Sequence, residues 1–590
     1  MSNFETLFFL MLVTMEKVNE FYNNRLKQLE VEASLLKKKS RYILVARLVS
    51  FLMILGCFYI FGINATSALI AFVLFMAFLK LVAISVDQKK RIKFNTSLIN
   101  INLAELNALD GKCSFDPGKE FESSKHAFSS DLDLFEDKGV FSFLNRTSTL
   151  KAKKAFADLL LNGNKNIDKF QQQTNGLIEE MTWTQEFRAF GDSEDTESDW
   201  VNGTSSIDVN IWNKLEVVIL PLMCSALIIL SVVGMISVQV IFYFTSISSF
   251  VILFRQKKMN SIAATFLKNE QKAVIMLKRA DLISRLSSDS PSLFTIEADL
   301  LLVAMRNYLK ISNLLNARNN LLINFFLNTL FGLDSYLKIK MQQWKLAFDS
   351  KIENWENELV NVELVICAAT IKFNYPTTIH PSKCSKKEIE IKGLSHPLIH
   401  HLSPIVNDFE LVDQKAFYIL TGPNMAGKST YLRSIGLSIV FANAGLPVFA
   451  ERMSWSGFKL FTSMRNKDDI NTSSSYFYSE LKRLKLIIDT IEKKSDIIVL
   501  LDEILKGTNS IDKQEGSAKY LLKIKRLGAK GVIATHDLKL CELENEYFEN
   551  NCFDSEINDD QLHFDYKIRK GICKNMNASF LMKKMNLIDE

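Results

Sequence analysis

Apolar residues are concentrated in two blocks of the chain. In the first block, residues 42–61 are almost wholly apolar, and a short turn at 62–64 leads into a second apolar run. Each run is about twenty residues, the length that a helix needs to cross the hydrocarbon of a bilayer. Basic clusters at 37–41 and 89–93 flank the block, and the turn carries no charge. Because positive charge favours the cytoplasmic side, both ends of the block are expected there. The pattern predicts a transmembrane hairpin over 42–88, with a buried hairpin of a soluble protein as the alternative.

The second apolar block covers residues 215–254 and is long enough for two crossings. Gly234, near its middle, indicates the position of the turn. A basic cluster at 255–258 closes the block on the cytoplasmic side, whereas Lys214 alone marks the other end. We therefore predict a second transmembrane hairpin over 214–255.

The rest of the chain has the pattern of a soluble protein. Helical periodicity continues beyond the second block, and short strands with turns begin near Lys387. The predicted parts are an N-terminal helical segment (1–41), a first hairpin (42–88), a soluble region (89–213), a second hairpin (214–255), a helical lever region (256–386) and an α/β domain (387–590).

A glycine-rich motif lies between a predicted strand at 415–420 and a predicted helix at 429–440. Residues 421–430 read TGPNMAGKST, which fits the pattern G-x-x-x-x-G-K-[ST]. Glycines let successive backbone N–H groups face phosphate oxygens, while Lys428 supplies a charge for the β- and γ-phosphates and the Ser429 hydroxyl can hold Mg²⁺. A glycine-rich turn without nucleotide is the alternative. The residues predicted to bind a nucleoside triphosphate are Gly422, Pro423, Asn424, Met425, Ala426, Gly427, Lys428, Ser429 and Thr430.

Two further predicted strands end in polar residues. Residues 497–501 are β-type aliphatics followed by Asp502 and Glu503, and residues 531–535 are followed by His536. Parallel strands deliver such tips to one edge of a sheet. Asp502 is expected to hold Mg²⁺ through water, Glu503 to orient and deprotonate the attacking water, and His536 to sense the γ-phosphate. An acidic turn and a plain surface histidine are the alternatives. The predicted catalytic residues are Glu503, His536 and Lys428, and the predicted metal-binding residues are Ser429 and Asp502.

These motifs together resemble the MutS family of ATPases, whose ATPase domain belongs to the ABC superfamily. The matching text is 421–430, Asp468-Asp469, SYFYSE at 475–480, DEILKGT at 502–508 with Asp512, and ATH at 534–536. The resemblance is strong over 395–575. It extends more weakly upstream, where FLNRTST at 143–149 is similar to the opening of the family's core domain.

The resemblance implies an α/β P-loop (ABC-type) ATPase domain preceded by an α-helical MutS-core-like region. It also implies ATP and Mg²⁺ as cofactors, and a homodimer in which each nucleotide is completed by the partner's signature serine. Ser475 matches that serine, with Ser473 and Ser474 as near alternatives, and Asp512 is expected at the dimer seam. Ala426 departs from the family's usual glycine. No mismatch-reading N-terminal domain is recognisable, so DNA enters as a partner by family analogy alone.

Composition adds two restrictions. The net charge of +5 does not by itself indicate a nucleic-acid partner, and the 8 cysteines lack C-x-x-C spacing, so we expect reduced thiols and no zinc site. The sequence thus predicts a multi-pass, membrane-anchored MutS-like ATP hydrolase of the inner (cytoplasmic) membrane, with its ATPase domain in the cytoplasm. An ABC-type transport ATPase and an ATP-controlled membrane scaffold without DNA binding are the alternatives.

Overall fold

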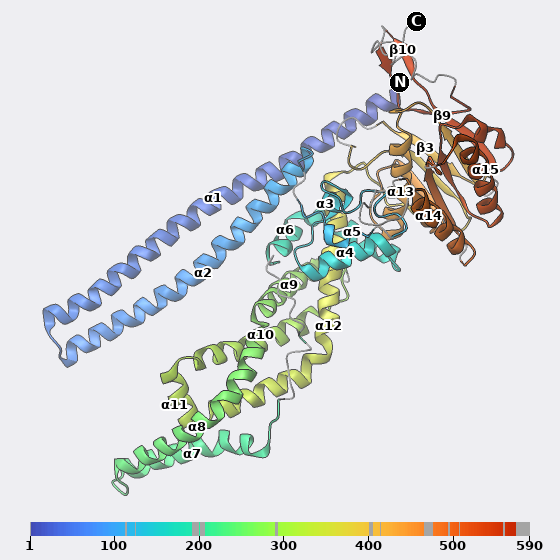
Figure 1. The fold of residues 1–590 in the computed structure, drawn as a ribbon. Helices are drawn as coiled ribbons and strands as arrows, with labels where there is room; N and C mark the ends of the chain where they lie inside the picture. The colour runs from blue at the N-terminus through green and yellow to red at the C-terminus, as the bar shows by residue number, and fades with distance from the viewer. Residues whose placement is uncertain are drawn as a thin grey trace. The chain divides into compact units, whose positions relative to one another are not determined.

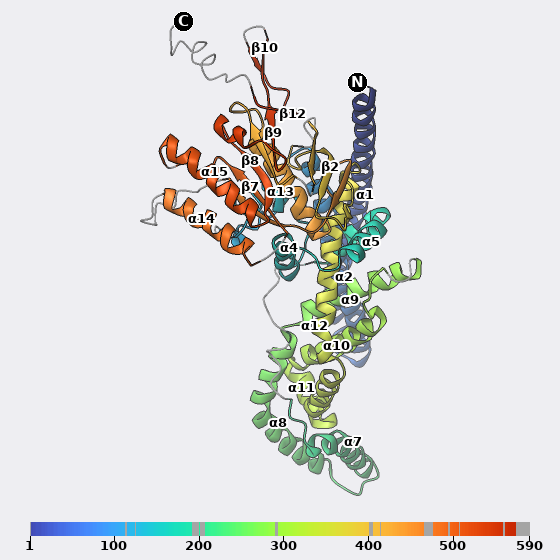
Figure 2. The ribbon, with the colours of Figure 1, turned by 90° about the vertical axis from the view of Figure 1, so that its right-hand side faces the viewer.

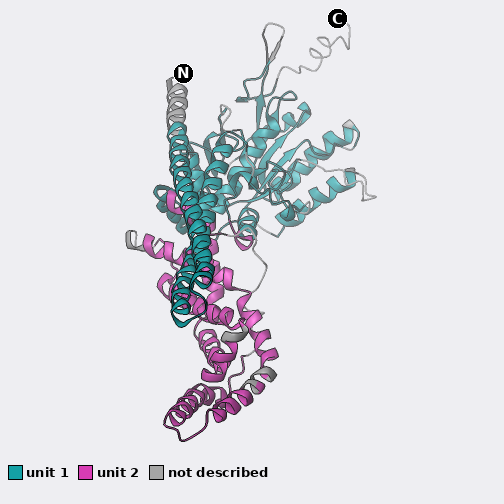
Figure 3. Cartoon of the chain, turned by 90° about the vertical axis from the view of Figure 1, so that its left-hand side faces the viewer, with its two compact units in different colours: residues 1–147, 153–181, 364–590 teal, residues 148–152, 182–363 magenta. Residues whose placement is uncertain are grey.

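The computed structural model divides the chain into two compact units (Figure 3). Unit 1 comprises residues 1–147, 153–181 and 364–590, and unit 2 comprises 148–152 and 182–363. The structure describes residues 2–112, 115–123, 126–191, 200, 207–289, 293–399, 405–412, 415–464, 476–493, 496–506, 508–558 and 561–573.

Unit 1 begins with a long antiparallel helical hairpin (Figure 1). Helix α1 is Ser2–Phe61 and α2 is Ala65–Leu109. The turn contains Gly62, which has φ +68°, and Asn64. The Asn64 side chain accepts a hydrogen bond from Ser67 N–H, and Asn64 N–H donates to the Ser67 hydroxyl oxygen. This pair of hydrogen bonds is a capping box, which stabilises the N-terminus of α2. The predicted turn at 62–64 is therefore confirmed.

Three helices are long and apolar enough to cross a membrane. They are residues Met15–Phe61 of α1, then α2, and then α7 (Ile211–Val232) in unit 2, each judged by length and composition. Their apolar side chains are largely exposed, as at Tyr59 of α1 and Leu69 of α2. Such surfaces are unusual for a helix surrounded by water.

A buried polar network joins the hairpin to the remainder of unit 1. The Arg146 guanidinium lies 2.7 Å from the Glu105 carboxylate of α2, and both side chains are at most 1% exposed. Asn374 donates to Glu105 at 3.1 Å and accepts from the Tyr22 hydroxyl of α1 at 2.7 Å. Four segments distant in sequence therefore meet around one ion pair.

The C-terminal part of unit 1 is α/β. Its larger sheet has the order β12-β9-β4-β8-β7-β6, parallel except for β12. Helix α13 packs on one face, and α14 with α15 on the other (Figure 2). The strands are β4 (Phe417–Thr421), β6 (Lys459–Ser463), β7 (Ile497–Asp502), β8 (Lys530–Ala534), β9 (Phe548–Phe553) and β12 (Ile568–Lys570). The helices are α13 (Lys428–Ala444), α14 (Tyr476–Ile491) and α15 (Ser510–Arg526).

Strand β7 shows why the sheet forms where it does. Its residues from Ile497 to Leu501 are all buried aliphatics, the pattern of a parallel strand covered on both faces. Backbone bonds align the strand ends, because Thr535 N–H donates to Leu420 C=O and Glu503 N–H donates to Ala534 C=O. The carboxyl ends of β4, β8 and β7 therefore lie side by side, as the sequence predicts.

The remaining elements of unit 1 are shorter. A second sheet has the order β1-β5-β2-β3, and β10 pairs with β11 as a hairpin. The strands are β1 (Ser382–Lys383), β2 (Ile389–Leu394), β3 (Asn407–Leu411), β5 (Arg452–Trp455), β10 (Glu556–Asn558) and β11 (Gln561–His563). Helices α3 (Val140–Leu144), α4 (Leu150–Asn162) and α5 (Ile167–Leu177) follow the first hairpin, and 3₁₀ turns lie at Lys119–Phe121, Ile178–Glu180 and Leu538–Leu543. The next helix, α6 (Met181–Ala189), lies in unit 2 except for its first residue.

Unit 2 is helical. Its second apolar hairpin is formed by α7 and α8 (Val238–Leu267), and Gly234 lies in the turn with φ +81°, as predicted. The hairpin is followed by α9 (Glu270–Asp289), α10 (Ala298–Arg318), α11 (Leu321–Phe331) and α12 (Leu333–Asn374), and the boundary between the units falls inside α12. Helix α12 ends two residues before Pro376, which disfavours helical backbone in the residue before it.

Candidate functional site

The glycine-rich loop connects β4 to α13. Gly422 has φ +147°, and a Cβ there would lie 2.7 Å from the Phe553 carbonyl oxygen. Gly427 has φ +99° and immediately precedes the first residue of α13. Only glycine adopts such backbone without strain. The loop therefore wraps around the N-terminus of α13, where free N–H groups and the helix dipole favour an anion.

Lys428 is the first residue of α13 and is buried. Its ammonium group donates to the carbonyls of Gly422 and Pro423 at 2.7 and 2.8 Å and lies 3.4 Å from His536 Nε2. Burial lowers the pKa of Lys428, although Glu503 and Asp502 oppose that effect. The lysine side chain thus lies inside the glycine-rich loop, where it is expected to contact the phosphates.

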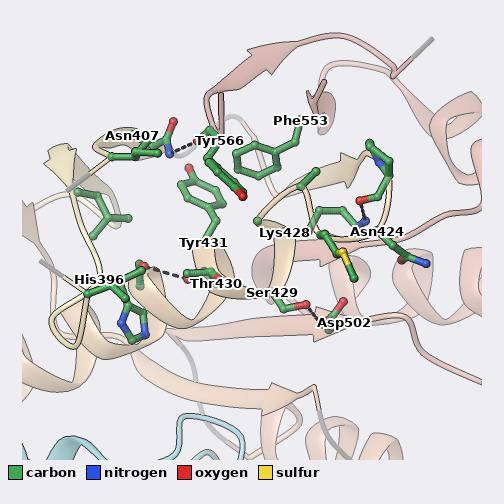
Figure 4. Close-up of a pocket in the computed structure, with 18 of the residues that line it drawn as sticks. His396, Asn407, Asn424, Lys428, Ser429, Thr430, Tyr431, Asp502, Phe553 and Tyr566 are labelled. Atoms are coloured by element: carbon green, nitrogen blue, oxygen red, sulfur yellow. Dashed lines mark hydrogen bonds between the residues drawn. The ribbon is translucent and has the colours of Figure 1, made fainter. Parts of the chain in front are cut away.

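Ser429 and Asp502 meet across the strand ends. The Ser429 hydroxyl donates to Asp502 Oδ2 at 2.6 Å (Figure 4). A hydroxyl and a carboxylate are the oxygen ligands that suit Mg²⁺, which usually keeps several waters as well. The pair therefore fits a magnesium ion that is also held by a phosphate. Among the described residues, no group of three or more His, Cys, Asp or Glu side chains could hold a metal.

Glu503 and His536 form the second contact between strand tips. Glu503 Oε1 lies 2.9 Å from His536 Nε2, and Lys506 lies 3.5 Å from Glu503 Oε2. The hydrogen bond with His536 is the main reason that the pKa of Glu503 falls to about 2, against the opposing effect of burial. The carboxylate is consequently ionised at neutral pH.

Glu480 of α14 supports the segment that follows Glu503. Its carboxylate accepts from Leu505 N–H at 2.6 Å. Glu503 and Leu505 both have positive φ, +49° and +61°, which is strained backbone for residues with side chains. The buried carboxylate holds that bent segment in place, and burial raises its pKa.

The loop residues from Pro423 to Gly427 border a pocket of about 740 Å³, together with Lys428, Ser429, Asp502 and Glu503. Figure 4 shows that side chains from distant segments complete its walls. They include His396, Asn407, Tyr431, Phe553 and Tyr566, none of which the motif analysis assigned to the site. Asn407 donates to the Tyr566 carbonyl at 2.9 Å, which ties β3 to the approach to β12. Burial lowers the pKa of His396 to about 4.

The predicted site residues are brought together in most cases. Residues 422–430 form the loop and the start of α13, and Asp502 and Glu503 line the same pocket. His536 joins them through Glu503 and Lys428. Asp512 lies apart, exposed in the first turn of α15, where its N–H donates to Asn509. Ser475, Ser473, Ser474 and Asp468-Asp469 fall outside the described residues.

Comparison with known proteins supports the assignment of this region. Residues 418–587 match the family model for MutS domain V. The chain is 35% identical over 207 residues to human MutS protein homolog 4, covering 32% of this chain and 21% of the relative. It is 34% identical over 194 residues to the DNA mismatch repair protein MutS of Thermosipho melanesiensis (32% and 23%), and 34% identical over 212 residues to that of Fusobacterium nucleatum (35% and 23%).

The chain therefore matches between a fifth and a quarter of the length of these relatives. The matched family model begins in β4 and includes the glycine-rich loop, the acidic strand tip and His536. The similarity to the MutS family therefore covers the C-terminal third of the chain, where residues 418–587 match MutS domain V.

Proposed function

We propose that residues 387–590 are a P-loop ATPase domain and that the protein is a membrane-anchored ATP hydrolase. The observation that carries the proposal is the convergence of Lys428, Ser429, Asp502, Glu503 and His536 at one edge of a parallel sheet, beside a pocket large enough for a nucleotide. Ligand pockets of small molecules are typically about 300–1,000 Å³.

Each residue has a role that its position supports. The loop N–H groups and Lys428 hold the phosphates, and Ser429 with Asp502 holds Mg²⁺ against them. A magnesium ion held there would supply positive charge against the phosphate oxygens. Glu503 orients the water that attacks the γ-phosphorus as the bond to the β-phosphate oxygen breaks. Because its carboxylate is tied to His536 and has a pKa of about 2, orientation is its main contribution and proton removal a smaller one.

The far wall of the pocket suits the rest of the nucleotide. Aromatic rings of Tyr431, Phe553 and Tyr566 line it together with His396. Such rings offer apolar faces to a purine base. His396, Phe553 and Tyr566 are distant in sequence from the glycine-rich loop, which explains why the motif alone does not reveal them.

Completion of the site by a second subunit is part of the proposal. Met425 at the tip of the loop is 84% exposed and has φ +67°, so an apolar side chain stands out beside the phosphate position. A partner's signature serine at Ser475, with Asp512 at the seam, would cover this tip in a homodimer.

Membrane anchoring rests on the exposed apolar surfaces of the helices described above. Three helices have the length and composition to cross a bilayer. The basic clusters at 37–41 and 89–93 favour a cytoplasmic location for both ends of the first hairpin. We propose an inner-membrane location with the ATPase domain in the cytoplasm.

DNA is proposed as a partner only because the relatives include DNA mismatch repair proteins. A salt series tests this proposal, since phosphate contacts make affinity fall steeply with salt. Absence of binding at low salt contradicts the DNA proposal and leaves ATP hydrolysis untouched.

Phosphate release by the full-length protein in detergent tests the ATPase proposal. Lys428→Ala should abolish nucleotide binding and turnover. Glu503→Gln should bind ATP normally and turn over about 10²-fold or more slowly. Lys523→Ala, which removes an exposed lysine from α15, is the matched control and should behave as the parent protein. Turnover by Lys428→Ala at the parent rate contradicts the proposal.

A further inference from the structure

Helix α11 in unit 2 has its polar and apolar faces reversed. Asn324, Asn328 and Thr329 are buried, with at most 6% of their surface exposed. Phe326 and Phe331, by contrast, are 56% and 52% exposed, and Phe325 is also exposed. A helix on a water-exposed surface shows the opposite arrangement, with its apolar stripe toward the core. The outward face of α11 therefore suits an apolar surrounding.

A charged cluster fixes this orientation. Arg318, at the end of α10, pairs with Asp334 at 2.5 Å, and the arginine side chain is 2% exposed. Asn328 accepts from Asp334 N–H at 2.6 Å and donates to the Asp334 carboxylate at 3.1 Å. Rotating α11 to bury its phenylalanines would break these bonds and leave buried polar groups unsatisfied. The outward position of the rings is consequently built into the fold.

Helix α11 packs beside the apolar hairpin of α7 and α8 (Figure 2). Gly332, directly after α11, lies against Glu216 and Leu220 of α7. The Cys224 thiol of α7 points to the Thr329 carbonyl, 3.8 Å away. The end of α11 that carries Phe331 therefore lies against the segment of α7 from Glu216 to Cys224.

Length and charge decide what can cover this surface. Helix α11 has 11 residues and is about 16 Å long, too short for the roughly 30 Å of a bilayer core. Residues 319–333 contain no charged side chain. The Glu216–Arg255 pair at 2.8 Å marks the polar end of the α7–α8 hairpin. An uncharged helix beside this end fits the outer part of one leaflet.

We propose that α11 is an interfacial helix whose phenylalanines contact the acyl chains of the leaflet that α7 enters from its Glu216 end. The occupant of the surface is lipid, because α11 packs against α7, a helix apolar and long enough to cross a membrane. This inference rests on the proposed membrane anchoring. It adds a lipid contact outside the helices that length and hydropathy identify.

Spin labels on the full-length protein in phosphatidylcholine–phosphatidylglycerol vesicles test the inference. Phe326→Cys places the label on α11, and Leu222→Cys places it on the exposed face of α7. Leu346→Cys is the control, because Leu346 of α12 is 81% exposed and lies more than two turns beyond the charged cluster. The signal of identically treated parent protein is subtracted for native cysteines. Collisions with oxygen report lipid, and collisions with a water-soluble nickel chelate report water.

The label at 326 should collide several-fold more with oxygen, and several-fold less with nickel, than the label at 346. If 222 is in lipid and 326 is as accessible to nickel as 346, the inference about α11 is wrong and membrane anchoring stands. If 222 and 326 are both in water, the proposed anchoring is wrong as well. Protection of 326 from both reagents indicates a second protein copy and overturns the lipid contact. Phe331→Cys repeats the test should Phe326→Cys fold poorly.

Discussion

Replacing Glu105 by glutamine should destabilise unit 1 strongly, although it only exchanges one carboxylate oxygen for an amide nitrogen. Glu105 is fully buried and receives Arg146 Nε at 2.7 and 3.0 Å, with Asn374 as a further donor. The substitution leaves the guanidinium buried without a counter-charge. Breaking a buried pair in this way costs about 3–5 kcal/mol. Arg146 keeps its hydrogen bonds to the Phe143 and Asn145 carbonyls. We therefore expect the free energy of unfolding to fall by about 3 kcal/mol, the lower end of this range.

Thermal unfolding of the detergent-solubilised protein, followed by circular dichroism, measures this effect. At an unfolding entropy of about 2.1 cal/mol/K per residue, the roughly 400 residues of unit 1 give a shift of about 1.2 °C per kcal/mol, so the midpoint should fall by roughly 3–4 °C. Asp87→Asn is the matched control, since Asp87 pairs with Arg91 on the same helix but both side chains are about two-thirds exposed. That exposed pair contributes about 1 kcal/mol at most.

The double variant Glu105→Met/Arg146→Met separates charge burial from loss of packing. Replacing both charges with apolar groups removes the unpaired guanidinium, so this variant should be more stable than Glu105→Gln. The reasoning is refuted if Glu105→Gln unfolds within the range of Asp87→Asn. It is equally refuted if the double variant is less stable than the single one.

Three further predictions concern the nucleotide pocket. Gly422→Ala should weaken ATP binding in an equilibrium titration by about tenfold or more, because its Cβ would meet the Phe553 carbonyl at 2.7 Å in a backbone conformation at φ +147°; unchanged affinity contradicts this. Ser429→Ala should raise the Mg²⁺ concentration needed for half-maximal hydrolysis and leave metal-free ATP binding intact, whereas an unchanged magnesium requirement argues against the hydroxyl as a ligand. Burial, with a contribution from Arg433, lowers the pKa of His396 from 6.5 to about 4, so its stabilising neutral form is fully present above pH 6.5 and is lost as the pH falls toward 4. Urea unfolding at pH 7 and pH 5 should therefore differ by roughly 2 kcal/mol more in the parent than in His396→Asn, and equal differences would show that His396 is not responsible.

Local sequence was sufficient for the central part of the site. The glycine-rich loop follows a short strand and precedes a helix, and each of these features is encoded within about ten residues. The convergence of Asp502 and His536 was also predictable, because parallel strands with polar ends meet at one edge of a sheet. Both hairpin turns follow from a glycine between apolar runs, at Gly62 and at Gly234.

Long-range contacts explain what the sequence could not predict. Asn407 reaches Tyr566 across 159 positions, and only the folded arrangement of β3 and the segment before β12 brings them to the pocket. Glu480 supports Leu505 from a helix 25 positions earlier. Helix α11 shows a second kind of feature that the sequence alone does not predict. Periodicity finds its polar stripe, but the charges of Arg318 and Asp334 decide that this stripe faces inward.

A structure of the protein with Mg²⁺ and a non-hydrolysable ATP analogue tests the central claim most directly. We predict that the triphosphate lies on the loop at 422–427, with Lys428 Nζ about 3 Å from a β- or γ-phosphate oxygen and Ser429 at the metal. Glu503 should face the γ-phosphate. A triphosphate bound elsewhere, with Lys428 still bonded to the Gly422 and Pro423 carbonyls, would contradict the account.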